Sequence, residues 1–259
     1  MIIILGKMGI WRRVLRQMKN DTFIIPDWRV PKNIKAIQTI RINGFSSKAF
    51  SSFNLSDSCG DTIGDVSKNI NKLNSYLPAN PKWLNQTHSS KVIKLPSEHD
   101  GGDASYTYYK NTVCAIQTAD CLPILLTDTF GRSVAAIHAG WKGMAFGIIE
   151  NTFKKMGIGS EAIVWLGPCI SKRNFEVGLD VYDIFIKRDP RTAICFNYKG
   201  SGKFNFDLIL AAKIKLKNLG VVNISTISNA CTFDDSDKFF SYRRDVVTGR
   251  MASLIWIES

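Results

Sequence analysis

The sequence predicts a mixed α/β fold, α+β-like, in a single domain with packed, partly antiparallel sheets flanked by helices. The chain has 259 residues, of which 45% are hydrophobic and 22% charged, as in an ordinary globular protein. Its apolar runs come in adjacent groups with helical stretches between them, which favours antiparallel pairing over a doubly wound parallel sheet. No Pro- or Ser-rich linker divides the chain, so we expect one domain over residues 18–259.

The first part of the chain predicts strands and one helix. Residues 34–42 form the first expected strand, which ends at an Asn-Gly turn. Residues 56–65 are polar with two glycines and predict a loop. Apolar residues recur at helical spacing over 66–77, and 83–95 predicts two short strands around a polar centre.

The middle of the chain predicts three strands and a helix. Apolar runs cover 113–117, 124–128 and 133–138, and the short turn between the last two predicts a β-hairpin. Residues 142–156 carry apolar side chains on one helical face, and Gly157 is well placed to end that helix.

The last third alternates again between strands and helices. We expect a strand over 162–166, a helix over 181–187 and a final strand over 252–257. A further helix over 208–219 begins after Asp207, whose carboxylate can cap its first turn.

Two lysine-containing segments have ordinary structural interpretations. Residues 199–203 resemble a phosphate-binding loop, but the first glycine and the Ser or Thr after the lysine are missing, so they predict a hairpin turn. Lys213, Lys215 and Lys217 are expected to point largely outward from their helix, as a solvated face does.

The net charge of +12 suggests either a nucleic-acid or anionic-membrane partner or a lysine-rich surface without a specific role. We favour the second interpretation, because the sequence has no RNA-binding or helix-turn-helix signature. No apolar run approaches the ~20 residues that span a membrane. Six cysteines without a C-x-x-C pair or a signal peptide predict reduced thiols. We therefore expect a cytoplasmic protein with no nucleic-acid and no membrane partner.

Two of the three histidines and one cysteine lie in polar or glycine-rich settings. Cys121 follows His88 by 33 residues and precedes His138 by 17, so only the fold could bring the three together. Two imidazoles and one thiolate would form a three-ligand zinc site with an open position, where zinc lowers the pKa of water to about 7. The alternative is two hydrogen-bonded histidines and a core cysteine.

Six motifs in the same order resemble those of the laccase-domain family, from about Phe23 to Ile257. Its members were first called multicopper polyphenol oxidases and later recognised as zinc-dependent purine nucleoside phosphorylases. The motifs are Asn85–His88, Thr118–Pro123, His138–Gly143, Leu166–Ile170, Phe175–Gly178 and Phe240–Asp245 followed by Thr248–Arg250.

The resemblance implies one catalytic zinc held by His88, Cys121 and His138. It also implies phosphorolysis of adenosine, inosine, guanosine and methylthioadenosine, with purine nucleosides and inorganic phosphate as partners, and deamination of adenosine through a zinc-bound hydroxide. Attack of hydroxide on C6 of adenine is how zinc deaminases act. The family fold is a single α/β domain, and we expect a monomer or small homo-oligomer.

The same motifs supply further candidate residues. Asp120 and Glu176 are candidates for acid–base catalysis or for binding ribose hydroxyls, although a turn cap and a surface carboxylate explain them equally well. Phosphate needs cations; Arg41 matches a family arginine, whereas Lys142 replaces the usual arginine and loses its bidentate geometry. The candidates for substrate binding are Arg41, Gln86, Trp141, Lys142, Arg243 and Arg244.

Residues 1–17 lie outside the resemblance and carry four basic and no acidic side chains. A transit peptide or a membrane-surface helix would explain this composition. We favour a start assigned too early, with Met18 as the true first residue, because the family match begins near Ile24.

Three other functions were considered. A cysteine hydrolase would use Cys121 as nucleophile and His138 as base. A multicopper centre needs many more histidines than three, but a single copper with polyphenol oxidase activity fits two histidines and one cysteine. A non-enzymatic binding module is the weakest alternative.

Overall fold

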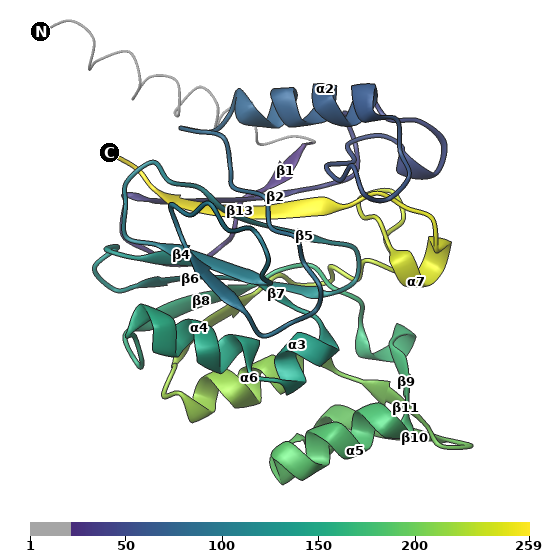
Figure 1. Ribbon diagram of the computed structural model, residues 1–259. Coiled ribbons are helices and arrows are strands. Elements are labelled where there is room, and N and C mark those ends of the chain that lie inside the picture. Colours follow the sequence, from purple (N-terminus) through teal and green to yellow (C-terminus); the bar gives the residue numbers. More distant parts are fainter. Residues whose placement is uncertain (1–21) are drawn as a thin grey trace, which may run out of the picture.

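The computed structural model describes residues 22–259, so the interpretation of residues 1–17 lies outside it (Figure 1). Two β-sheets pack face to face, and a third, smaller sheet projects from one end. Helices cover the outer faces, so the predicted mixed α/β fold with partly antiparallel sheets is confirmed. Among the described residues, no helix is long and apolar enough to cross a membrane.

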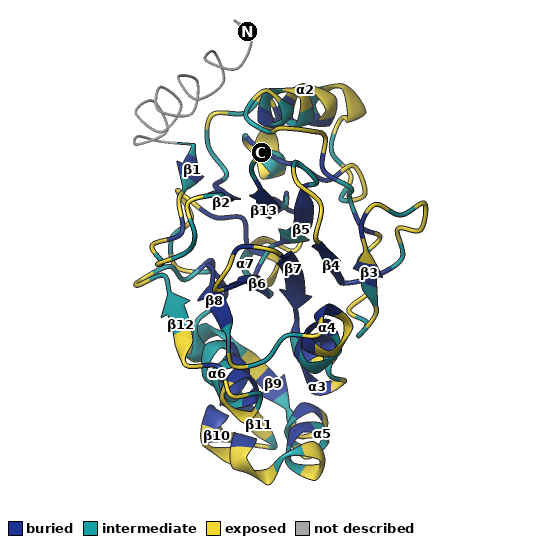
Figure 2. Cartoon of the chain, turned by 90° about the vertical axis from the view of Figure 1, so that its left-hand side faces the viewer, coloured by how far each residue is buried: buried dark blue, intermediate teal, exposed yellow. Residues whose placement is uncertain are grey.

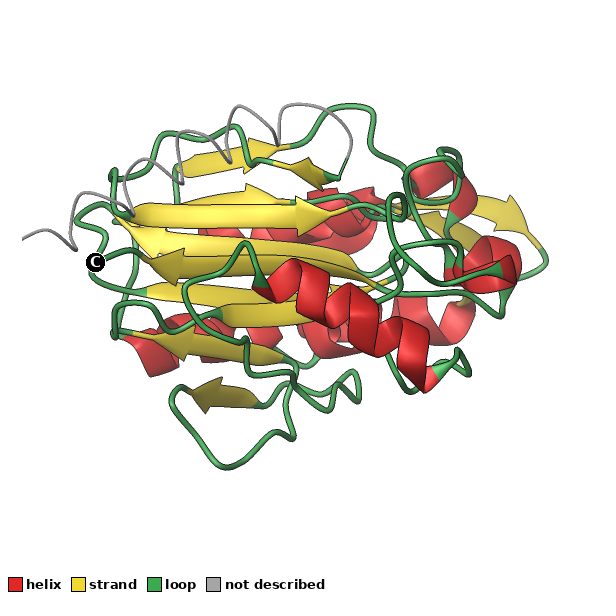
Figure 3. Cartoon of the chain, turned by 90° about the horizontal axis from the view of Figure 1, so that it is seen from above, coloured by secondary structure: helices red, strands yellow, loops and turns green. Residues whose placement is uncertain are grey.

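The four-stranded sheet is antiparallel throughout and forms the upper layer in Figure 1. Helix α2 (Ile63–Asn74) lies across its outer face and buries Leu73 against it, as seen from above in Figure 3. The strands, in spatial order, are β1 (Phe23–Ile24), β2 (Ile34–Thr39), β13 (Met251–Ile257) and β5 (Cys114–Thr118).

The six-stranded sheet is mixed. Cys121 directly precedes its strand β6, and His138 lies in its strand β7. Its strands, in spatial order, are β12 (Asn223–Thr226), β8 (Ala162–Leu166), β6 (Leu122–Asp128), β7 (Val134–Ala139), β4 (Ala104–Thr107) and β3 (Val92–Lys94). Only the two edge pairings, β12 with β8 and β3 with β4, are parallel. The predicted hairpin of residues 124–138 is confirmed as β6 and β7.

Three helices cover the outer face of the six-stranded sheet: α3 (Trp141–Ala145), α4 (Ile148–Met156) and α6 (Leu208–Asn218). The largest apolar cluster lies between them and the sheet, and a second one fills the space between the two sheets. Figure 2 shows the central strands buried and the outer helical faces exposed. Asp207 caps α6 as predicted, because its carboxylate accepts a hydrogen bond from the Leu210 amide at 2.9 Å.

The third sheet contains β9 (Glu176–Gly178), β11 (Lys203–Phe206) and β10 (Phe196–Gly200), with α5 (Leu179–Arg188) against it. Stacked aromatic rings hold it together, such as Phe196 on Phe206 with centroids 4.3 Å apart. Its β10–β11 hairpin turns at residues 200–203, which confirms the predicted turn. A short helix, α7 (Tyr242–Asp245), precedes β13.

Three local predictions were wrong. The helix expected over 142–156 is two helices, because Gly147 adopts a left-handed φ of 91° between α3 and α4. Lys215 does not point outward; it is 8% exposed and forms an ion pair with Glu150 of α4 at 2.7 Å. Of the two strands expected over 83–95, only three-residue β3 forms, and the remainder is a loop.

Candidate metal centre and cavity

A cavity of about 740 Å³ opens where β5 ends and β6 begins. Its walls include the loop before α2, the 83–88 segment, the β5–β6 turn and α7 with the residues that follow it, together with His138 of β7, Trp141 of α3 and Phe175. Aromatic side chains line it together with polar groups, and the volume lies within the usual range for small-molecule sites.

His88, Cys121 and His138 meet in the wall of this cavity. His88 comes from a loop, Cys121 from the β5–β6 turn and His138 from the C-terminal end of β7. Their nearest ligand atoms all lie within 4.8 Å of one another, and Cys121 Sγ lies 3.6 Å from His88 Nε2. His88 is exposed, Cys121 is half-buried and His138 is buried, and all three residues line the cavity.

The geometry of the cluster fits a metal ion. Ligands at 2.0–2.3 Å around a tetrahedral zinc lie roughly 3.5 Å apart. The Cys121–His88 separation of 3.6 Å matches this spacing, and small side-chain rotations would bring His138 to it. The cluster offers three ligands, whereas a structural zinc site usually takes four from the protein.

Asp103, which we did not single out in the sequence, organises two of the three ligands. It is fully buried, and one carboxylate oxygen accepts a hydrogen bond from His138 Nδ1 at 2.8 Å. The same carboxylate accepts the backbone N–H groups of Thr87, His88 and Ser89 and the hydroxyl of Ser89. Because Nδ1 of His138 is engaged with Asp103, Nε2 is the ring nitrogen of His138 that would bind a metal.

Cys121, His138 and Asp103 each shift the pKa of a neighbour towards its charged form. Burial raises the pKa of the Cys121 thiol, but the imidazoles of His138 and His88 outweigh it and lower that pKa. Burial lowers the pKa of His138, but the Cys121 thiolate and the Asp103 carboxylate raise it. Burial likewise opposes ionisation of Asp103, yet hydrogen bonds from His138 and Ser89 bring its pKa to about 2. The cluster therefore holds a thiolate, the form in which cysteine binds metals.

Glycines give the cluster room. A Cβ atom on Gly140 would lie 2.9 Å from both Cys121 Sγ and His88 Cδ2, and one on Gly143 would lie 2.8 Å from the Ser89 carbonyl oxygen. The two glycines of the His138–Gly143 motif thus allow α3 to start directly against the ligands.

The cavity also contains four other predicted site residues: Gln86, Asp120, Trp141 and Arg243. Gln86 holds the loop to β5, because its amide group bonds both the N–H and the C=O of Gln117. Asp120 accepts hydrogen bonds from the Thr232 hydroxyl and the Arg243 amide, both at 2.6 Å, so its carboxylate ties the β5–β6 turn to neighbouring segments.

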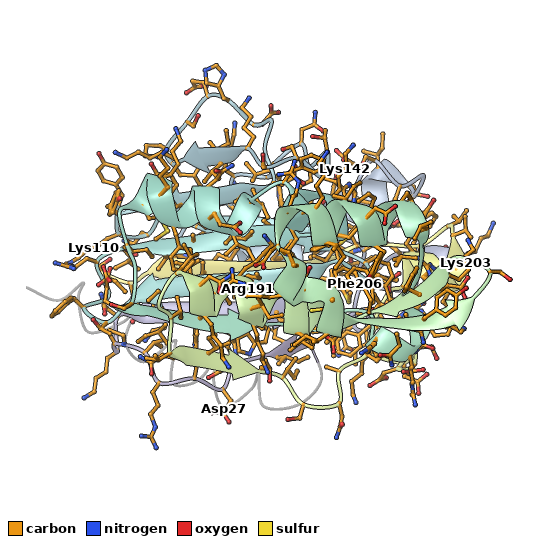
Figure 4. The ribbon with its side chains drawn as sticks, turned by 90° about the horizontal axis from the view of Figure 1, so that it is seen from below. Asp27, Lys110, Lys142, Arg191, Lys203 and Phe206 are labelled. Atoms are coloured by element: carbon orange, nitrogen blue, oxygen red, sulfur yellow. The ribbon has the colours of Figure 1, made fainter. Side chains whose placement is uncertain are left out.

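The other predicted substrate-binding and acid–base residues lie outside the cavity lining. Lys142 is exposed on the helical side of the molecule (Figure 4). Glu176 pairs with Lys199 at 3.3 Å. Arg41 and Arg244 donate to main-chain carbonyl oxygens of surrounding loops, Arg41 to Ser51 and Ser236 and Arg244 to Thr232, Phe233 and Phe239.

Phe175, Tyr242 and Arg250 line the cavity and were not proposed as site residues from the sequence. All three lie inside motifs that the sequence analysis quoted, so the motifs were the signal that could have found them. Asp103 lies in no such motif.

The chain is similar in sequence to a known family and to named proteins. Residues 35–258 match the model of a family described as "Multi-copper polyphenol oxidoreductase laccase". A Haemophilus influenzae protein named "Purine nucleoside phosphorylase" is 45% identical, with 91% of this chain and 99% of that protein covered. The Escherichia coli "Purine nucleoside phosphorylase YfiH" is 41% identical over 90% of this chain and 98% of its own length.

Solved structures show the same fold. A crystal structure of a Neisseria meningitidis protein superposes with a TM-score of 0.88 at 41% identity and covers 92% of this chain and all of that one. A Geobacillus stearothermophilus protein, YlmD, superposes with a TM-score of 0.85 at 26% identity and covers 93% of this chain and 98% of its own.

Proposed function

The chain belongs to the multi-copper polyphenol oxidoreductase laccase family, and on that premise we propose that it is a zinc-dependent purine nucleoside phosphorylase that also deaminates adenosine. Its substrates would be adenosine, inosine, guanosine and methylthioadenosine together with inorganic phosphate. The similar proteins named purine nucleoside phosphorylase support the first activity.

One observation carries the proposal. The His88–Cys121–His138 cluster lines one cavity together with Arg243, Arg250 and aromatic residues. Trp141, Phe175 and Tyr242 offer ring faces for a purine, and the arginines offer charge for phosphate. A nucleoside and a phosphate ion therefore have complementary groups in the same space.

The phosphorolysis balances without any further reactant. A phosphate oxygen forms a bond to C1′ of the ribose while the bond from C1′ to N9 breaks. The electron pair of the broken bond stays on the purine, which takes up a proton, and the sugar leaves as ribose 1-phosphate. The residues of this chain would hold the phosphate below the ring and keep the purine against the aromatic wall.

Deamination needs only water. The oxygen of water replaces the 6-amino group of adenine and ammonia leaves. Zinc, when bound by His88, Cys121 and His138, would supply a Lewis acid that lowers the pKa of water. Asp103 would keep the protonated Nδ1 of His138 pointing away from that position, through its hydrogen bond of 2.8 Å.

Metal analysis combined with a product assay tests the proposal. We expect one zinc per chain, conversion of adenosine to adenine only in the presence of phosphate, and conversion to inosine with or without phosphate. His138→Ala should lose zinc and both activities. His99→Ala is the matched control, because His99 is exposed in a loop outside the cluster. Full turnover and full zinc content in Cys121→Ala would contradict the proposal.

A cysteine hydrolase remains the second candidate, because one observation favours it. Without a metal, Cys121, His138 and Asp103 form a thiolate–imidazolium–carboxylate series, the arrangement of nucleophile, base and orienting acid. The two candidates differ in their response to inhibitors. A chelator should abolish activity of the zinc enzyme, whereas a cysteine hydrolase should keep its activity in chelator. Copper reconstitution of the metal-free protein, followed by a phenol oxidation assay, tests a single-copper oxidase.

A further inference from the structure

We propose that Arg250, together with Arg243, forms the subsite for inorganic phosphate in this cavity. The inference deepens the proposed function and rests on it for the identity of the anion. Arg250 was not a candidate from the sequence. Two observations support this role: the position of its backbone beside the β5–β6 turn and the hydrogen bonds of its guanidinium group.

The phosphate subsite needs a cation that reaches the cavity. Within residues 22–259, the arginines that line the cavity are Arg243 and Arg250, and no lysine lines it. Arg41, Lys142 and Arg244 do not line it. Of the four cations named from the sequence, Arg243 lines the cavity, and Arg250 is the second arginine in its lining.

Both guanidinium groups lack a carboxylate partner in the described part of the chain. Arg243 Nη1 donates to the Glu176 carbonyl oxygen at 3.0 Å. Arg250 Nη1 donates to the carbonyl oxygens of Thr248 and Gly249 at 2.9 and 3.0 Å. These bonds hold each guanidinium group through Nη1, and an arginine has further N–H donors that can bind an anion.

The backbone places both arginines next to the turn that carries Cys121. Met251 pairs with Thr118 in the sheet, so Arg250 lies at the level of Ala119, two residues before Cys121. The Arg243 backbone amide donates a hydrogen bond to the Asp120 carboxylate at 2.6 Å. The two cations are therefore anchored to residues next to the metal ligand.

Neighbouring groups complete the subsite. Arg250 is partly buried and stands over the Tyr242 ring at 5.9 Å from the centroid, and Arg243 stands over Phe175 at 5.2 Å. The buried Thr118 belongs to the same cavity wall, and its hydroxyl oxygen has no hydrogen-bond partner among the described residues. Two carboxylates at the cavity, Asp57 and Asp100, are exposed. The third carboxylate in the cavity lining, Asp120, already accepts hydrogen bonds from the Thr232 hydroxyl and the Arg243 backbone amide.

Phosphate binding to wild type, Arg250→Met and Arg250→Lys, measured by isothermal titration calorimetry, tests the subsite. Loss of a charged hydrogen-bond partner for phosphate costs about tenfold to hundredfold in affinity. We expect the dissociation constant for phosphate and the phosphate KM to rise by that factor in Arg250→Met. The phosphate dissociation constant of Arg250→Lys should lie between those of wild type and Arg250→Met, because lysine keeps the charge but lacks the planar guanidinium group. Arg29→Met, a change of an exposed arginine outside the cavity, should bind phosphate like wild type.

Deamination separates this inference from a general loss of function. Since deamination uses no phosphate, Arg250→Met should lower the rate of phosphorolysis at a given phosphate concentration more than it lowers the adenosine-to-inosine rate. An unchanged dissociation constant for phosphate in Arg250→Met overturns the subsite, as does a wild-type protein that binds no phosphate. If Arg250→Met proves unstable on thermal unfolding, an unchanged phosphate affinity in Arg250→Lys overturns it equally. If wild type binds phosphate but releases no purine, the proposed function fails while the titration still decides the subsite.

Discussion

Asp103 acts on the metal centre through its neighbours, because its carboxylate holds both the ring of His138 and the peptide that carries His88. Groups of this kind typically contribute tenfold to hundredfold to metal affinity. We expect Asp103→Asn to weaken zinc binding by about that factor, measured by competition with a chromophoric chelator. Asp27→Asn, on an exposed and distant carboxylate (Figure 4), is the control. Equal zinc affinity in wild type and Asp103→Asn would show that the carboxylate does not position the ligands.

The same carboxylate gives a pH dependence whose sign follows from its pKa. Hydrogen bonds from His138 and Ser89 outweigh burial and hold the pKa of Asp103 at about 2, below its usual value of 3.8. A lowered carboxylate pKa stabilises the fold above the unfolded-state pKa, and the contribution disappears as pH falls towards 2. It amounts to about 2 kcal/mol.

Urea unfolding of metal-free wild type and Asp103→Asn at a series of pH values measures this contribution. We expect the difference in the free energy of unfolding between the two proteins to shrink by about 2 kcal/mol from pH 5 to pH 2. A difference that stays constant over this range would mean that Asp103 is not ionised in the folded protein.

Much of the centre was predictable at this scale, but Asp103 was not. His88, Cys121 and His138 stand inside recognisable motifs, whereas Asp103 has no local pattern of its own. Its contact with His138 depends on the register of β4 and β7, in which Ala104 pairs with Ile137. A single sequence does not specify that register, so the partner of the histidine could not be read from it. Arg41 and Lys142 stay predictions as substrate-binding residues; they lie outside the cavity lining, and a motif gives the residue type but not the direction of the side chain.

At the scale of elements, the start of α3 is limited by the space around Gly140. A methyl group there would overlap Cys121 Sγ and His88 Cδ2, and overpacking of this kind costs about 1–3 kcal/mol. We expect Gly140→Ala to reduce zinc affinity while circular dichroism shows the fold retained. The contrast is Gly64→Ala in the exposed first turn of α2, where a Cβ meets nothing within 4 Å, and zinc affinity should not change. Similar zinc affinities for both variants would refute the steric argument.

Helices and strands were predicted well where the apolar pattern agrees with the turn and capping residues at its ends. The β6–β7 hairpin has apolar runs on both sides of a turn, and α6 has a capping aspartate and a clear end. The break between α3 and α4 was missed because the helical apolar period continues across Gly147. Lys215 was misplaced because a lysine in a helix is usually solvated, and only the packing of α6 on α4 reveals Glu150 as its partner.

For the whole molecule, the metal should act as a cross-link between distant parts of the chain. The three ligands come from a loop, the β5–β6 turn and β7, and none of these is held to the others by a disulfide. Free zinc at about a thousand times its dissociation constant adds about 4 kcal/mol. For a domain of this size that corresponds to roughly 10 °C in Tm.

Differential scanning calorimetry with and without chelator measures this stabilisation. Wild type and Cys59→Ser, a change of a cysteine outside the cluster, should both lose about 10 °C in chelator. Cys121→Ser should melt at the same temperature with and without it. A chelator-insensitive Tm in wild type would contradict a cross-linking metal.

The architecture as a whole was predictable in class and not in detail. The grouping of apolar runs indicated antiparallel sheets with helices outside, and that arrangement is present. The order of strands was not accessible, because β13 at the end of the chain inserts between β2 and β5. This insertion brings Arg250 beside the β5–β6 turn, so the second cavity arginine depends on a pairing between segments more than a hundred residues apart.

The turn of the β6–β7 hairpin is a suitable position for insertions or new chain termini. Cys121 and His138 both lie at its open end, whereas the connecting turn with the exposed Phe130 lies at the other end, about 20 Å away along the strands. A fusion partner, a fluorescent reporter or new termini at that turn would lie at the far end of the strands. The entrance to the cavity would therefore stay open.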